Sequence, residues 1–134
     1  MARADRVFFA PRHQLVAVHV SINGLRDFLL VVDTGAARMV ISSRAARRLG
    51  LDLAHPIRTE ALVGVGQTRP LPVIRLNAVQ VGGSAVANLE ASVLDLPPVF
   101  QADGLIGLPF LRRFRVTIEF DTRSLVLRAL PLAR

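Results

Sequence analysis

The 134-residue chain contains no cysteine, tryptophan, tyrosine or lysine. Without cysteine it cannot form a disulfide framework, use a thiol nucleophile or bind a metal through thiolates. The absence of cysteine is compatible with an oxidising or a reducing compartment. No apolar stretch approaches the roughly 20 residues that a membrane-spanning helix needs, so no membrane segment is expected. Residues 1–12 are too charged to contain the apolar centre of a signal peptide. We therefore expect a cytoplasmic protein, or a soluble fragment of a longer or anchored one.

All 17 basic residues are arginines, and the formal net charge is +7. Nucleic-acid binding would be one use of this charge. However, the arginines are scattered from Arg3 to Arg134, and no tryptophan or tyrosine is present to stack on bases. We expect a solvated basic surface and no nucleic-acid partner, although such a surface could favour acidic segments of a polypeptide or another anionic partner.

Other catalytic and cofactor patterns are missing. His13, His19 and His55 lack the spacing of metal ligands, so no metal is expected. No serine lies in a Gly-x-Ser-x-Gly elbow. The segment 64–69 lacks the third glycine of a dinucleotide-binding loop and the lysine of a phosphate-binding loop. We therefore expect no cofactor.

Short strands separated by turns are predicted along most of the chain. Val16, Val18 and Val20 would share one face of a strand over residues 15–20, and Asn23-Gly24 suits a hairpin turn. Further strands are expected at 28–32, 40–41, 73–81, 86–94 and 114–127, with a brief helix that begins after Ser42 or Ser43 and ends at Gly50. Pro70-Leu71-Pro72 is expected to interrupt regular strand pairing. This spacing predicts an all-β, barrel-like fold with one or two short helices, in a single domain spanning residues 1–134.

Asp33-Thr34-Gly35-Ala36 directly follows the apolar run 28–32. A continuous apolar run is typical of a strand buried on both faces, and a carboxylate at the end of such a strand costs free energy, so we expect Asp33 to have a function. Gly35 allows a sharp turn and leaves its N–H free to approach a neighbouring carboxylate. An aspartate before Thr-Gly can also be an ordinary turn former, and that alternative stays open at this point.

The tetrapeptide resembles the active-site motif of the aspartic proteases, specifically of the short single-motif retropepsin type, and the apolar-rich segment 108–121 is most similar to that of bacterial retropepsin-like proteins. Later segments follow in that family's order: Gly64-Val65-Gly66 as the tip of a flap hairpin, residues 102–111 as the segment beneath the catalytic loop with its short helix, and 114–127 as closing strands. The resemblance covers about residues 15–127 and implies a retropepsin-like closed β-barrel, one lobe of the acid protease fold. Gly-x-Gly could also end any hairpin, and we assign Asp103-Gly104 a structural role.

A single carboxylate cannot both take a proton from water and donate one to the carbonyl oxygen of a peptide bond. In a pair of close carboxylates, repulsion raises one pKa and leaves the other low, so the pair shares one proton. This chain has one Asp-Thr-Gly and no second copy. A C₂ homodimer would supply the second carboxylate, because it brings the two copies of Asp33 together on the symmetry axis.

The resemblance assigns catalysis to Asp33, Thr34 and Gly35, and substrate binding to Ala36, Gly64, Val65 and Gly66. It implies that Thr34 directs its hydroxyl to the partner's backbone and that the flap closes over an extended peptide, with apolar pocket walls from Val31, Val65 and Ile106. The prediction is a homodimeric aspartic endopeptidase acting on extended polypeptide segments. The alternative is a catalytically inactive module that keeps the fold for peptide binding or dimerisation; the intact Asp-Thr-Gly favours the enzyme.

Overall fold

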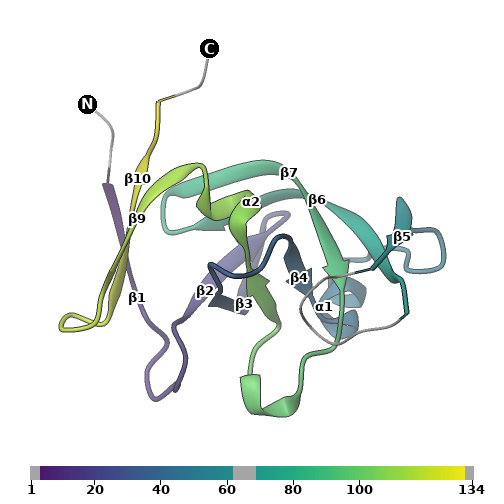
Figure 1. Ribbon diagram of the computed structural model, residues 1–134, viewed down its shortest axis with the longest axis horizontal. Coiled ribbons are helices and arrows are strands. Elements are labelled where there is room, and N and C mark those ends of the chain that lie inside the picture. The colour runs from purple at the N-terminus through teal and green to yellow at the C-terminus, as the bar shows by residue number, and fades with distance from the viewer. Residues whose placement is uncertain (1–3, 62–68, 132–134) are drawn as a thin grey trace.

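The computed structural model describes residues 4–61 and 69–131 (Figure 1). The first part contains β1 (Ala4–Phe8), β2 (Ala17–Ile22), β3 (Leu25–Val32), β4 (Met39–Ile41), α1 (Ser43–Arg48) and β5 (Arg58–Glu60). The second contains β6 (Leu71–Val81), β7 (Ser84–Val93), the 3₁₀ turn η1 (Pro98–Phe100), β8 (Gly104–Ile106), α2 (Leu108–Leu111), β9 (Phe114–Glu119) and β10 (Ser124–Ala129). The predicted all-β fold with short helices is confirmed. No helix in these residues is long and apolar enough to span a bilayer.

Seven strands form one sheet in the order β2-β3-β8-β4-β7-β6-β5. Because β2 also pairs with β6, six of these strands close into a barrel, and β5 lies outside β6 (Figure 1). Closure removes the exposed edges that an open sheet would present. The barrel predicted from the spacing of the strands is therefore present.

Strand β8 lies between two strands from the first half of the chain. It pairs parallel to β3, with Val32 opposite Ile106, and antiparallel to β4, with Ile41 opposite Gly104. The chain must therefore pass from β3 to β4 across the end of β8. Residues 33–38 make this crossing, so the topology fixes the position of the segment that begins with Asp33.

The first and last strands pair in a separate three-stranded antiparallel sheet of order β1-β10-β9 (Figure 1). Strands β9 and β10 are the predicted closing strands. Strand β1 was not predicted from the sequence; it pairs with β10 from Ala4 opposite Arg128 to Phe8 opposite Ser124. The Arg6 side chain adds an ion pair to Glu119 of β9, with 2.6 Å between Nη1 and Oε1.

Buried apolar side chains form two clusters on opposite faces of the sheet. Phe28 and Leu30 of β3 belong to the larger cluster, whereas Val31 belongs to the smaller one. This division follows from the two-residue period of a strand. The smaller cluster consists of Ala10, Ala17, Val31, Val40, Leu71 and Leu105. Strand β3 is thus covered on both faces, as its continuous apolar run predicts.

Two local predictions are confirmed and one is wrong. Asn23 and Gly24 have φ of 51° and 80°, as a tight turn between β2 and β3 requires. Ser42 caps α1 by accepting a hydrogen bond from the Ala45 N–H at 3.0 Å, and Gly50 follows the helix with φ of 73°. Pro72, expected to interrupt pairing, instead lies within β6 opposite Thr59. It is the second residue of the strand, opposite a short edge strand, where a missing N–H is tolerated.

Candidate active site

Asp33 begins the turn that follows β3. Its N–H donates to the carbonyl of Ile106 at 2.9 Å, and its own carbonyl accepts from the N–H of Ala36 at 3.2 Å. The expected hydrogen bond from the Gly35 N–H to Asp33 Oδ1 is present at 2.9 Å. Asp33 is half-buried, whereas Thr34 and Gly35 are exposed. The turn therefore presents a carboxylate at the surface while holding one of its oxygens through the backbone.

Gly107 supports this loop from beneath. The neighbouring Leu108 N–H donates to the carbonyl of Ala36 at 2.9 Å. A Cβ added to Gly107 would lie 2.3 Å from the carbonyl oxygen of Arg38 and 2.7 Å from that of Ala36. Real Cβ atoms do not approach backbone oxygens so closely. The loop can therefore pack this closely only against a glycine. Gly104 is restricted in the same way, because its Cβ would lie 1.9 Å from the Val40 carbonyl oxygen.

Asp103 joins three segments through hydrogen bonds. Its Oδ2 accepts from the Leu29 N–H at 2.8 Å, and its own N–H donates to the Leu29 carbonyl at 2.7 Å. Its carbonyl accepts from the N–H of Ser42, the capping residue of α1, at 2.8 Å. These contacts agree with the structural role expected for Asp103.

Ala36 packs against the smaller apolar cluster. Within that cluster Val31 lies opposite Leu105 in the parallel β3–β8 pair. Ile106, the next residue, points to the other face and is fully buried in the larger cluster. The expectation that Ile106 walls a pocket together with Val31 is therefore wrong, and Leu105 lies on that face instead. Neighbouring residues of a strand face opposite sides of the sheet, and the resemblance to the family did not indicate which of the two lies on the side of Val31.

The proposed flap tip, Gly64-Val65-Gly66, lies outside the described residues, so its role stays a prediction. Strand β5 ends at Glu60 before this segment, and β6 begins at Leu71 after it. The two strands pair antiparallel, with Glu60 opposite Leu71.

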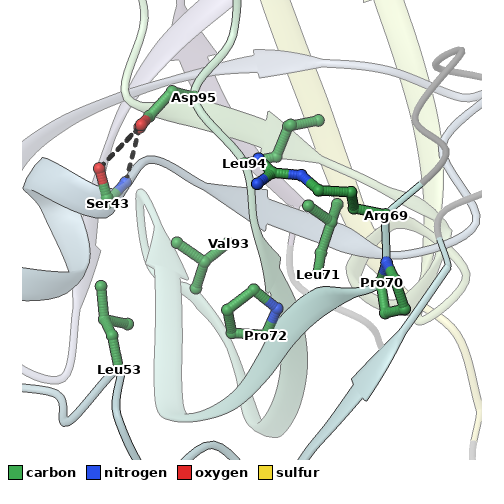
Figure 2. Close-up of a pocket in the computed structure, with 9 residues that line it drawn as sticks. All are labelled: Ser43, Leu53, Arg69, Pro70, Leu71, Pro72, Val93, Leu94 and Asp95. Atoms are coloured by element: carbon green, nitrogen blue, oxygen red, sulfur yellow. Dashed lines mark hydrogen bonds between the residues drawn. The ribbon is translucent and has the colours of Figure 1, made fainter.

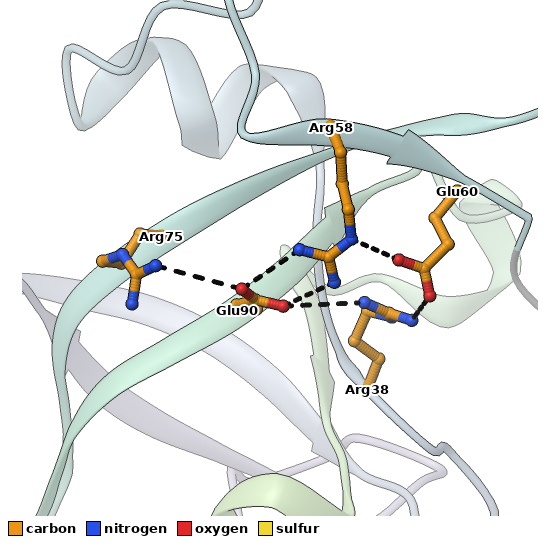
Figure 3. Close-up of polar contacts among 5 residues, drawn as sticks. All are labelled: Arg38, Arg58, Glu60, Arg75 and Glu90. Atoms are coloured by element: carbon orange, nitrogen blue, oxygen red, sulfur yellow. Dashed lines mark hydrogen bonds and ion pairs between the residues drawn. The ribbon is translucent and has the colours of Figure 1, made fainter.

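Five charged side chains form a network between the Asp33 loop and the sheet (Figure 3). At its centre, Arg58 binds Glu90 through two contacts, 2.6 Å from Nη2 to Oε1 and 3.1 Å from Nη1 to Oε2. Glu60 accepts hydrogen bonds from Arg58 Nε and Arg38 Nη2 on different oxygens. Arg75 Nη2 lies 3.9 Å from Glu90 Oε2. The network thus connects the residue that ends the Asp33 loop with strands β5, β6 and β7.

The network changes the acidity of its members. Hydrogen bonds from Arg58 first, and from Arg38 second, lower the pKa of Glu60 below its ordinary value. The hydrogen bonds of Arg58 likewise lower the pKa of Glu90. In return, Glu90 first and Glu60 second raise the pKa of Arg58. The network therefore favours the ionised form of both glutamates.

Sequence reasoning missed this network because it treated the arginines as a dispersed surface charge. Two signals were available. Arg58 and Glu60 are two residues apart, which places them on one face of a strand, and Arg38 closely follows the Asp-Thr-Gly. The cross-strand pair of Arg75 and Glu90 required the register of β6 and β7.

A cleft of about 500 Å³ opens between the start of α1, the start of β6 and the end of β7 (Figure 2). Ser43 borders it and donates to Asp95 Oδ1 from its N–H at 2.8 Å and from its hydroxyl at 2.9 Å. Leu71 and Leu94 line the cleft and also contribute to the smaller apolar cluster or pack against it. Residues 33–36 do not line this cleft. Within the described parts of the chain, no three histidine or acidic side chains gather as metal ligands would.

The comparisons with known proteins agree with this geometry. Residues 18–110 match the family described as Aspartyl protease, so the chain belongs to that family, and its fold is of the retropepsin-like type. No curated protein sequence matches the chain.

The solved structures that share the fold include the following two. A retropepsin-like aspartic protease from Rickettsia conorii is 23% identical with a TM-score of 0.74, and the match covers 96% of this chain and 92% of that one. The retroviral protease-like domain of Ddi1 from Leishmania major is 24% identical with a TM-score of 0.58, and the match covers 86% of this chain and 93% of that one.

Proposed function

We propose that this protein is a homodimeric aspartic endopeptidase that hydrolyses peptide bonds in extended polypeptide segments. The observation that carries the proposal is the placement of Asp33. Its half-buried carboxylate follows a strand covered on both faces and accepts the Gly35 N–H, on a loop that rests on Gly107. Membership of the aspartyl protease family supports the same chemistry.

Two copies of Asp33 are needed because each chain supplies one Asp-Thr-Gly. The ionised carboxylate takes a proton from a water molecule, whose oxygen then attacks the carbonyl carbon of the peptide. The protonated carboxylate donates its proton to the carbonyl oxygen, and the C–N bond breaks as the amine nitrogen gains a proton. A two-fold axis between the chains brings the identical carboxylates together.

The neighbouring residues have supporting roles in this proposal. Thr34 is exposed, so its hydroxyl is available to the backbone of the partner chain. Gly35 holds Asp33 through its N–H, and Ala36 leaves room for the substrate beside the two carboxylates. Gly64, Val65 and Gly66 close over the bound peptide. The apolar cluster beneath Ala36 favours substrates with hydrophobic side chains near the cleaved bond.

The direct test compares the wild type with Asp33→Asn by cleavage profiling of a peptide mixture at mildly acidic pH. Asn keeps the shape of Asp but cannot take the proton from water, so we expect turnover to fall by at least about a thousandfold, with unchanged circular dichroism. Asp121→Asn is the matched control, because Asp121 is an exposed carboxylate in the β9–β10 turn.

Wild-type turnover by the Asp33→Asn variant would rule out this mechanism. Binding of extended peptides by the wild type, without cleavage at any pH, would favour the noncatalytic peptide-binding module instead.

A further inference from the structure

Within the described residues, three sets of polar contacts attach the loop of residues 33–38 to other elements. Two of them involve the backbone: the Asp33 N–H bonded to Ile106, and the Ala36 carbonyl bonded to Leu108 above Gly107. The third is made by the side chain of Arg38 at the far end of the loop. It is the contact that joins the loop to β5, the strand that leads into residues 62–68.

The side chain of Arg38 links the Asp33 loop to neighbouring strands and is little exposed to a ligand. Its side chain is only 19% exposed, and its guanidinium spans Glu60 and Glu90, with Nη1 4.0 Å from Glu90 Oε1. Its carbonyl oxygen faces Gly107, where no Cβ fits. The backbone of Arg38 is thus held from beneath while its side chain is held from β5 and β7 (Figure 3). A planar guanidinium bound on two sides has few alternative geometries.

We propose that the ion pair of Arg38 with Glu60 positions the Asp33 loop for catalysis, so that Arg38 is a positioning residue of the active site. This inference rests on the proposed function. A misplacement of reacting groups by about 1 Å can cost a hundredfold in rate, so a contact that fixes the loop affects turnover without touching the substrate. Arg58 also donates a hydrogen bond to Glu60, and this bond lowers the pKa of the Glu60 carboxyl.

The test is a double-mutant cycle with Arg38→Met, Glu60→Gln and the combined variant. If the two side chains act through each other, each single change lowers kcat by about tenfold or more with KM within about twofold, and the combined variant is no slower than the slower single variant. Arg38→Lys keeps the positive charge but lacks the planar guanidinium that can contact two carboxylates. We therefore expect its kcat to lie between those of Arg38→Met and the wild type. Asp52→Asn is the matched control, because it removes a carboxylate from the exposed Asp52–His55 ion pair.

Hydrogen exchange provides a second measurement that does not depend on activity. The amides of Asp33 and Leu108 are bonded across the base of the loop. We expect both to exchange at least about tenfold faster in Arg38→Met and in Glu60→Gln than in the wild type, and at the wild-type rate in Asp52→Asn.

Three results would overturn the positioning role. They are a raised KM with unchanged kcat, which would make Arg38 a substrate-binding residue; additive losses in the combined variant; and unchanged exchange of the two amides. If the wild type cleaves no peptide, the proposed function fails, and the exchange comparison alone decides whether Arg38 positions the loop.

Discussion

At the scale of single residues, Gly107 and Gly35 affect the Asp33 loop in different ways. A methyl group at Gly107 would collide with two backbone carbonyl oxygens, and neither can move without displacing the loop. We predict that Gly107→Ala lowers the free energy of unfolding by at least about 2 kcal/mol. Urea denaturation measures this loss, and stability equal to the wild type would contradict the packing described here.

Gly35→Ala is the comparison within the same loop. Gly35 is not in the left-handed region, and its added Cβ would lie 3.3 Å from Asp33 Oδ1. We expect stability within about 0.5 kcal/mol of the wild type but a loss of turnover, because the carboxylate must shift to make room.

Residues that interact within a short stretch of chain could be identified from the sequence, and residues whose partners lie elsewhere could not. Asp33 and Gly35 are near neighbours, so their hydrogen bond followed from the order of residue types. Arg38 has partners on β5 and β7, which only the folded chain brings together.

At the scale of secondary-structure elements, the ion network attaches β5 to the barrel. Strand β5 has three residues and, within the described parts of the chain, pairs with β6 alone. The contacts of Arg58 with Glu90 of β7, and of Glu60 with Arg38, therefore contribute to holding it. The folded state lowers the pKa of both glutamates below the ordinary value of 4.5. Their contribution to stability is therefore complete above pH 4.5 and is lost as the pH falls below it.

We predict that Arg58→Met makes stability depend less on pH in that acidic window and raises the pKa of both glutamates towards the ordinary value. Urea denaturation between about pH 3 and 6 and NMR titration of Glu60 and Glu90 measure the two effects. Arg75→Met should have a smaller effect, because Arg75 contacts Glu90 at 3.9 Å and is not among the causes that lower the pKa of Glu60. Equal acid dependence in the wild type and Arg58→Met would show that the network does not hold β5.

Elements with an apolar pattern were predictable, whereas elements held by their neighbours were not. Strand β3 and the α1 cap follow from local sequence, as does the turn at Asn23-Gly24. Strands β1 and β5 contain charged residues and pair with segments distant in sequence or with a single neighbour. Local propensity carries little information about such strands, since pairing and packing decide them.

At the scale of the whole molecule, barrel closure and the terminal sheet depend on long-range pairing. The contacts of β2 with β6, and of β1 with β10, cannot be read from hydrophobic periodicity. The barrel was nevertheless expected, because many short strands at regular spacing favour closure and because the Asp-Thr-Gly motif resembled a known family. The family match over residues 18–110 confirms that resemblance.

The central claim is that catalysis requires Asp33 from two chains, and a subunit-mixing experiment tests it most directly. Wild type and Asp33→Asn are mixed, allowed to exchange subunits, and assayed for peptide cleavage per wild-type chain. Random pairing predicts about half of the original activity per wild-type chain at an equal ratio, and about a quarter with a threefold excess of the variant. Activity per wild-type chain that stays constant at every ratio would contradict the shared active site.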